Sequence, residues 1–223
     1  MMRKMFVLMV ALTIVSVPVA ANMLVNGDFE TGDLTGWTAF QSSWTSGTPT
    51  IEAQTTTVNS GTFALQLSAA NSSFGVYQAI ATVPGVKYQI DVSWLGNNQS
   101  AFWNEVLLFN DDGRDMETQL NGPLDPYVLS KVDGWGMNPP AIFGWKSPFD
   151  GNQWYPAGLH TNVITATGTT MFVGLKAGTV ANSNGAVDLF FDNVSVTAIP
   201  EPSSLLALVS GIGALGFVIR RRK

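Results

Sequence analysis

Apolar and polar residues alternate in short runs along the middle of this chain. The clearest run, Lys87 to Trp94, places Tyr, Ile, Val and Trp at every second position, with polar residues between them. A β-strand points successive side chains to opposite faces, so each such run buries one face. Gly, Asn and Pro interrupt the runs, and no long internal segment has the i, i+3, i+4 apolar spacing of a helix. The sequence therefore predicts an all-β protein.

The same pattern recurs often enough to build two packed sheets. Further strands are predicted at residues 63–67, 75–81, 105–109, 162–166, 170–175 and 188–196. Several short strands separated by turn residues are typical of a β-sandwich, often a jelly roll. Residues from about 110 to 158 interrupt this rhythm, and a structureless loop of that length is uncommon in a compact domain. We therefore expect an insertion there that is packed by its own aromatic side chains.

The last predicted strand changes phase partway along. Leu189 and Phe191 fall on one side of an ideal strand, whereas Val194 and Val196 fall on the other. An irregularity near Asp192 would return both pairs to the core. It would also leave the Asp192 carboxylate available for a role other than ladder pairing.

Both ends of the chain have the features of export signals. Arg3 and Lys4 precede an apolar run that ends in small residues, which is the layout of a secretory signal peptide over residues 1–21. Residues 203–219 are apolar, slightly short for an ideal membrane helix, and are followed by four basic residues that should stay in the cytoplasm. We therefore expect residues 22–198 to form one exported domain that is transiently anchored in the membrane.

The net charge of this exported body limits the classes of partner that it is expected to bind. Five basic and 15 acidic residues fall within 22–198, so the body has a formal charge of −10. Nucleic-acid binding relies on Lys and Arg that neutralise phosphates, so no nucleic-acid partner is expected. Carboxylates are instead suited to divalent cations. The chain has no cysteine, which excludes disulfides and thiolate chemistry.

The residues after the body resemble a known sorting signal. Pro200, Glu201 and Pro202, followed by the short apolar span and an Arg-rich end, resemble the PEP-CTERM signal of exported bacterial proteins. The resemblance covers residues 199–223 only. It implies that an exosortase-type membrane protease recognises the Pro-Glu-Pro segment and removes the tail, in bacteria that make exopolysaccharide. The expected destination is the cell surface or the extracellular matrix.

Three segments of the body resemble carbohydrate-binding modules with a galactose-binding-like jelly roll. They are the N-G-x-F-E opening at residues 26–30, the strand at 60–67, and the ending at 191–196. The resemblance brackets the body, but the segment from about 110 to 158 does not align with it. The resemblance therefore supports the jelly-roll fold more directly than any particular ligand.

In the modules that this body resembles, a calcium ion commonly joins these three segments. The resemblance implies a structural calcium held by the Glu30 and Asp192 side chains, with backbone carbonyls from Gly27 and Thr62 and a further carboxylate from Glu52. Carboxylates and carbonyls are the ligands that calcium prefers. The alternative is that both acids only accept hydrogen bonds from turns.

Aromatic side chains are the candidates for sugar contact, because sugar rings have apolar C–H faces that stack on flat rings. Trp37 and Trp94 are predicted to lie in the core instead. Packing within loops remains the alternative for each of the others. The candidate carbohydrate-binding residues are Trp103, Trp135, Trp145, Trp154 and Tyr155.

Catalysis is not expected of this chain. The only histidine, His160, has no cysteine partner, and no G-x-S-x-G nucleophile motif occurs. The sequence predicts a non-catalytic surface or biofilm-matrix protein that binds exopolysaccharide through a calcium-stabilised jelly roll. A structural or adhesive matrix protein that binds proteins without sugar specificity is the alternative. A glycoside hydrolase, which needs only two suitably spaced carboxylates, is less favoured.

Overall fold

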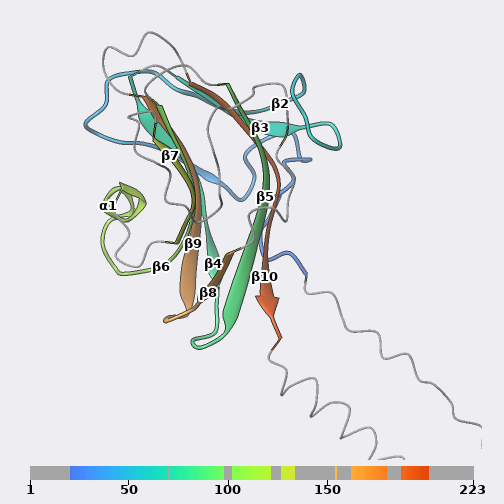
Figure 1. The fold of residues 1–223 in the computed structure, drawn as a ribbon, viewed down its shortest axis with the longest axis vertical. Coiled ribbons are helices and arrows are strands. Elements are labelled where there is room, and N and C mark those ends of the chain that lie inside the picture. Colours follow the sequence, from blue (N-terminus) through green and yellow to red (C-terminus); the bar gives the residue numbers. More distant parts are fainter. Residues whose placement is uncertain are drawn as a thin grey trace, which may run out of the picture.

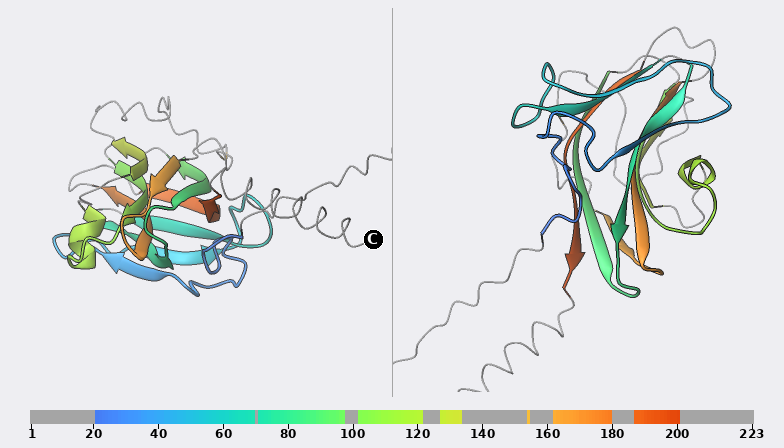
Figure 2. Two further views of the ribbon diagram at one scale, coloured as in Figure 1. Left: turned by 90° about the horizontal axis from the view of Figure 1, so that it is seen from below. Right: turned by 180° about the vertical axis from the view of Figure 1, so that it is seen from behind.

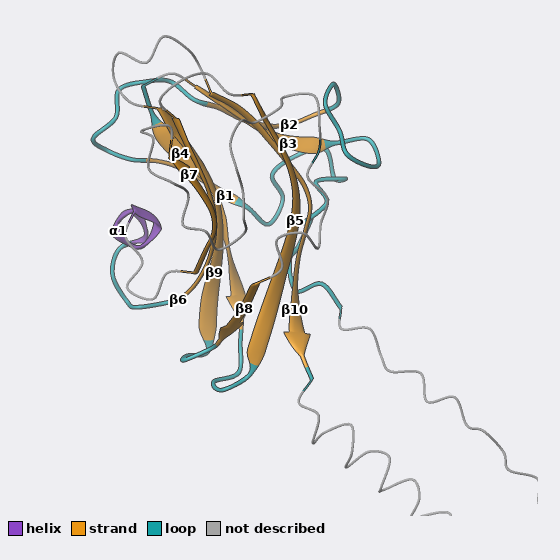
Figure 3. Cartoon of the chain, in the orientation of Figure 1, coloured by secondary structure: helices purple, strands orange, loops and turns teal. Residues whose placement is uncertain are grey.

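The structure is a computed structural model, and it describes residues 21–69, 71–97, 102–121, 127–133, 154, 162–179 and 187–200. In these residues two five-stranded antiparallel sheets pack face to face, with one short helix outside them (Figures 1 and 3). The all-β sandwich predicted from the alternating runs is confirmed. The predicted signal peptide, apart from Ala21, and the predicted span at 203–219 lie outside the described residues. Within the described part of the chain, no helix has the length and apolar character needed to cross a bilayer.

Each sheet takes strands from both halves of the chain. Sheet A has the order β1 (Thr38–Gln41), β4 (Ser73–Ala81), β9 (Thr170–Thr179), β6 (Phe102–Asn110) and β7 (Tyr127–Asp133). Sheet B has the order β2 (Thr50–Gln54), β3 (Ala64–Ala69), β10 (Val187–Ile199), β5 (Lys87–Asn97) and β8 (Asn162–Thr165). The helix α1 (Met116–Asn121) lies on the outer side of sheet A, beside β6 and β9 (Figure 1).

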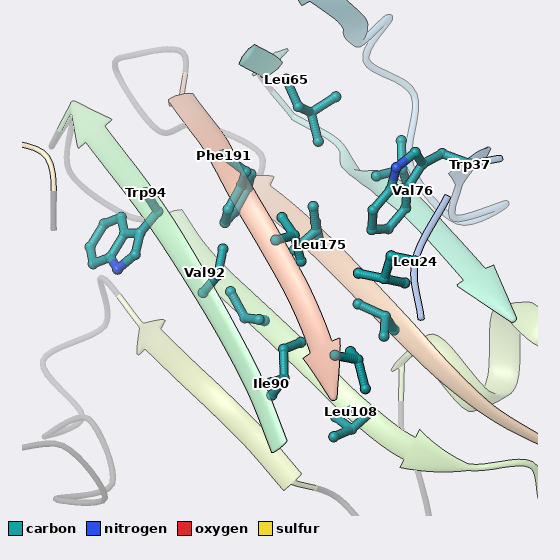
Figure 4. Packing of buried hydrophobic residues seen from close by; sticks show 14 of the residues in the cluster. Leu24, Trp37, Leu65, Val76, Ile90, Val92, Trp94, Leu108, Leu175 and Phe191 are labelled. Carbon is teal, nitrogen blue, oxygen red and sulfur yellow. The ribbon is translucent and has the colours of Figure 1, made fainter. Parts of the chain in front are cut away.

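The core fills the space between the sheets. Figure 4 shows side chains of β3, β5 and β10 in sheet B meeting those of β4, β6 and β9 in sheet A. The alternation that predicted β5 is reproduced, because Tyr88, Ile90, Val92 and Trp94 are all buried. Trp37 and Trp94 are core residues, as predicted. All buried residues of this cluster lie between Leu24 and Val196, so residues 22–199 contain the whole described core.

The predicted irregularity in the last strand is present. The pairing of β10 with β5 shifts register between Asp192 and Ser195, and Asn193 has a positive φ of 52°. This bulge turns Val194 and Val196 back to the core, where both are buried with Leu189. A bulge leaves its extra residue out of the ladder, so the backbone here bonds other groups: the Asn193 N–H donates to Asp192 Oδ1 at 2.7 Å and the Val194 N–H to the Gly27 carbonyl at 2.8 Å.

The first residues of the body form hydrogen bonds with the C-terminal half of β10. β3 pairs with β10 only as far as Phe191. Beyond that point the Met23 N–H donates to the Val196 carbonyl at 2.9 Å, and the Asn22 side chain bonds the backbone of Val194 and Val196 at 3.0 Å. The first described residues and the end of β10 therefore lie side by side, at one end of the sandwich (Figure 2).

Candidate functional site

The Asp192 carboxylate is buried at the β10 bulge, where it accepts three backbone hydrogen bonds. Asp192 has no solvent-exposed surface. Its Oδ2 accepts from the N–H groups of Asn59 and Ser60 at 3.1 and 3.0 Å, and its Oδ1 accepts from the Asn193 N–H at 2.7 Å. The carboxylate therefore anchors the loop before β3 to the last strand.

Glu30 binds the next residues of the same loop. Its Oε1 accepts from the Thr62 N–H at 2.8 Å and from the Phe63 N–H at 3.0 Å. The carboxylate reaches them by passing over Gly61, where a Cβ would collide with the Glu30 carboxyl group. Gly61 also has a φ of 69°, which favours glycine. We call Glu30, Asp192 and the loop 59–63 between them the carboxylate junction.

The two carboxylates of the junction have opposite pKa shifts. The backbone N–H groups of Phe63 and Thr62 lower the pKa of the exposed Glu30 carboxyl. Burial raises the pKa of the Asp192 carboxyl against the lowering effect of its three N–H donors, and the nearby negative charge of Glu30 raises it further. The junction thus holds two neighbouring negative charges, one of them fully buried.

Two of the other three predicted calcium ligands, Gly27 and Thr62, lie at the junction. Gly27 lies against the bulge, because its carbonyl accepts from the Val194 N–H at 2.8 Å and a Cβ there would collide with the Val194 carbonyl. Thr62 is in the loop that Glu30 binds. Glu52 lies in β2 opposite Gln66, and no group of three or more His, Cys, Asp or Glu residues gathers anywhere in the described part of the chain. The structure therefore brings Glu30, Asp192, Gly27 and Thr62 together without a third carboxylate.

A second feature is a row of aromatic rings on the outer face of sheet A. The row crosses four neighbouring strands, with ring centroids 6.3 Å apart for Phe40 and Tyr77, 6.2 Å for Tyr77 and Phe172, and 5.7 Å for Phe172 and Phe109. Phe109 and Phe172 are buried beneath α1, whereas Phe40 and Tyr77 are only partly covered. The row therefore becomes more accessible towards the β1 edge of the sheet.

A buried ion pair lies on the same outer face. Lys176 of β9 is opposite Glu105 of β6, and its Nζ is 2.9 Å from Glu105 Oε2. The same ammonium donates to the Leu120 carbonyl of α1 at 3.2 Å. Leu120 itself packs over Gly174, where a Cβ would lie only 3.1 Å from its Cδ2 atom. The ion pair and the small Gly174 together seat α1 on the sheet.

The loop between β1 and β2 carries an exposed tryptophan beside α1. Trp44 is 63% exposed, although the backbone on both sides of it is fixed. The N–H and hydroxyl of Thr45 donate to the Ser42 carbonyl at 3.1 and 2.8 Å, which closes a tight turn. The N–H and hydroxyl of Ser43 donate to Glu117 Oε1 of α1 at 2.7 and 2.9 Å. We call residues 42–45 the Trp44 turn.

The predicted carbohydrate-binding residues are mostly beyond the described structure. Trp135, Trp145 and Tyr155 lie outside the described residues. Trp154 is partly buried, and Trp103 lies in β6, opposite Gly178 of β9. These five therefore remain predictions.

Trp44 was not among the predicted residues. A usable signal was present, because Trp44 stands alone within Ser42-Ser43-Trp44-Thr45-Ser46-Gly47, a run of small polar residues that cannot bury it locally. Large apolar side chains in such runs depend on tertiary contacts for cover, and here the structure leaves most of the indole exposed.

The C-terminal segment decides how the chain is sorted. β10 ends at Ile199, and the family model of the PEP-CTERM protein-sorting motif matches residues 198–223. The chain carries a PEP-CTERM sorting motif. This motif indicates export, with a membrane-anchored sorting signal before processing, and implies an exosortase-type protease as a partner. No curated protein sequence matches the chain significantly.

Solved structures of similar fold include several carbohydrate-binding modules. "Family 16 Carbohydrate Binding Module-2" aligns with a TM-score of 0.50 at 17% identity, over 79% of this chain and 99% of that one. TmCBM61 in complex with β-1,4-galactotriose gives 0.49 at 14% identity, over 81% and 100%. The CBM22-1 xylan-binding domain of Xyn10C from Paenibacillus barcinonensis gives 0.48 at 13% identity, over 83% and 99%. At 17% identity and a TM-score of 0.50, the likeness to the family 16 module shows the jelly-roll fold alone.

Proposed function

We propose that this chain is an exported, non-catalytic protein of the cell surface or biofilm matrix that binds a polysaccharide through its jelly roll. The observation that carries the proposal is a carbohydrate-binding-module fold whose last strand leads directly into a PEP-CTERM motif, with β10 ending at Ile199 and the motif's tripeptide beginning at Pro200. The fold is associated with glycan binding, and the motif delivers the protein to the place where exopolysaccharide accumulates.

The accessible part of sheet A supports sugar binding in chemical terms. Phe40 and Tyr77 present partly covered rings near the β1 edge, and Trp44 adds an exposed indole in the adjoining loop. Aromatic rings offer flat apolar surfaces to the C–H faces of sugars, while neighbouring polar groups bind the hydroxyls. Such a surface needs neither a nucleophile nor a pair of catalytic acids.

We further propose that calcium binds at the carboxylate junction and stabilises the fold. The donor types fit, because Glu30 and Asp192 supply carboxylates and each carbonyl oxygen of the surrounding backbone has a second lone pair. Burial is the main cause that raises the pKa of the Asp192 carboxyl, and the neighbouring Glu30 charge adds to it; a divalent cation would offset that repulsion. The bound ion would supply charge neutralisation and a link between the first and last segments of the body.

Calcium is therefore expected to raise the melting temperature of residues 22–199. Binding to the native state alone stabilises a protein by about 2.7 kcal/mol at one hundred times the dissociation constant. For a domain of this size that corresponds to roughly 5–10 °C. Thermal unfolding in calcium and in chelator measures the difference. Identical melting curves in the two conditions contradict the calcium proposal and leave sugar binding as a separate question.

The test of the proposed function is a polysaccharide screen of purified residues 22–199. Affinity gel electrophoresis against soluble neutral and acidic polysaccharides, with calcium and with chelator, should reveal saturable retardation by at least one of them. A cooperative melting curve establishes that the sample is folded. Complete absence of retardation by the folded protein would reject the polysaccharide proposal and favour a matrix protein that binds other proteins.

A further inference from the structure

We propose that the Trp44 turn is a preformed stacking platform for a neutral pyranose unit of a polysaccharide. This inference rests on the proposed function and deepens it, because it names a contact residue and a class of sugar. Four features of the described structure carry it: the exposure of Trp44, the fixed backbone on both sides of it, the polar groups around it, and the distribution of charge.

The exposure of Trp44 is unusual for a tryptophan in a folded domain. Tryptophan is highly buried on average, and burying an aromatic side chain contributes strongly to stability. Among the other tryptophans with described exposure, Trp37 and Trp94 are only 7% and 1% exposed, and Trp154 is partly buried. Trp44 keeps 63% of its surface in solvent. A large apolar surface in such a position is suited to cover by a ligand.

The turn is fixed in place by bonds to three other parts of the body. The Ser42 N–H donates to the Ser73 carbonyl at 2.8 Å, which extends the pairing of β1 with β4. The Asn121 side chain at the end of α1 donates to the Ser42 hydroxyl at 3.0 Å. Beyond the turn, the Gly47 N–H donates to the Asn71 carbonyl at 2.9 Å. The backbone that presents the indole is therefore ordered before any ligand arrives, which reduces the entropy cost of binding.

Hydrogen-bonding groups of the kind that recognise sugar hydroxyls surround the turn. The Ser43 hydroxyl and the Glu117 carboxylate are bonded to each other, and both Ser43 bonds use Oε1, so Glu117 Oε2 takes no part in them. Asn121 is exposed beside them, and the Asn71 amide bonds the Ser46 hydroxyl at 2.9 Å on the other side. An exposed indole on a turn whose neighbours carry amides, hydroxyls and a carboxylate combines the two kinds of group that bind a pyranose.

The charges near the turn favour a neutral sugar over an acidic one. Glu117 places a negative charge directly against Ser43. Two of the basic side chains in the described structure are committed elsewhere, Arg114 to Asp112 and Lys176 to Glu105. A uronate or sulfate would therefore meet a like charge within a body that carries −10 overall. A neutral hexose or pentose chain has no such penalty.

The experiment compares Trp44 variants of residues 22–199 in affinity gels that contain soluble galactan, xylan or β-glucan as neutral probes and polygalacturonate or alginate as acidic probes. Trp44→Ala should weaken binding to the retained neutral polysaccharide about tenfold or more at an unchanged melting temperature. Trp44→Phe keeps a flat ring and should retain most of the affinity. Val83→Ala is the matched control: Val83 is 60% exposed and follows the end of β4, whereas the Trp44 turn lies beside its start.

A fluorescence titration localises the sugar independently of affinity. The neutral polysaccharide should change the indole emission of the unaltered protein, and Trp44→Phe should lose most of that change while still binding. Equal affinity of Trp44→Ala and the unaltered protein would overturn the platform and leave the proposed function standing. Stronger retention by the acidic probes would overturn the neutral-sugar assignment. A folded protein that binds none of the probes would reject the proposed function and this inference together.

Discussion

Asp192→Ala should lower the free energy of unfolding of residues 22–199 by about 3 kcal/mol or more, because three backbone N–H groups lose their acceptor. Each buried polar group that loses its only partner costs about 1–3 kcal/mol. The groups are those of Asn59, Ser60 and Asn193, and all of them point at a side chain with no exposed surface. Water that enters the cavity would recover part of this cost. Urea unfolding in chelator measures the hydrogen-bond contribution alone.

Measurements with and without calcium distinguish the two proposed roles of Asp192, as a metal ligand and as an acceptor of backbone hydrogen bonds. In calcium, the unaltered protein should gain stability over its value in chelator, and Asp192→Ala should gain none. Asp192→Asn keeps one acceptor oxygen, so it should lose less stability in chelator while still failing to respond to calcium. This pattern would distinguish a metal ligand from a carboxylate that only holds a loop.

Asp188→Ala is the matched control for this prediction. Asp188 is an acidic residue of the same strand, but it is only half-buried and accepts one bond, from the Gln66 side chain at 3.3 Å. Its removal should cost less than about 1 kcal/mol and leave the calcium response intact. If Asp192→Ala is no less stable than Asp188→Ala, the carboxylate junction does not have the structural role assigned to it.

The strands that the sequence predicted are those that turn a row of apolar side chains to the core. β3, β4, β5, β6, β8, β9 and β10 match the predicted runs, since each alternates between a core face and a second face. β7 was missed because it lies within residues 110–158, which the sequence predicted as an insertion. β1 and β2 were missed because they are short edge strands with mostly exposed or partly exposed residues. Their position depends on pairing with β4 and β3, and nothing within five residues of sequence specifies that pairing.

The helix α1 was missed for a related reason. Six residues are too few to show an apolar period, and isolated helices of that length are not stable. Asp115 caps it by accepting from the Thr118 N–H at 2.9 Å, and a second contribution comes from Leu120 and Lys176, which hold it against sheet A. That second contribution is tertiary and is not visible in the local sequence.

The carboxylate junction was predictable in part because its signals are local. The phase change around Asp192 required a bulge, and the motif resemblance placed Glu30 beside the loop before β3. The Trp44 turn was not predicted, because its rigidity depends on Glu117, which is 74 residues away along the chain. A sequence pattern can indicate that a tryptophan lacks cover from its neighbours in the chain, but only the fold shows that the residues beside it are hydrogen-bonded to distant parts of the body.

Lys176→Met should be the second strongly destabilising change, at about 3–5 kcal/mol. The variant leaves the Glu105 carboxylate buried with its ammonium partner removed, and breaking a buried ion pair on one side typically costs this amount. It also removes the donor to the Leu120 carbonyl, which should loosen α1 on the sheet. Urea unfolding and hydrogen exchange of the α1 amides measure the two effects.

The double variant Lys176→Met with Glu105→Leu tests the cause of that loss. Replacing both charges with apolar side chains of similar volume also removes the carboxylate that has lost Lys176, and such replacements are often neutral or stabilising. Most of the global stability should therefore return, while the added exchange of α1 should persist because the Leu120 carbonyl still lacks its donor. Lys87→Met, at an exposed lysine at the start of β5, should change stability by no more than about 0.5 kcal/mol. A double variant as unstable as Lys176→Met alone would show that packing of the lysine stem, and not the charge left on Glu105, sets the cost.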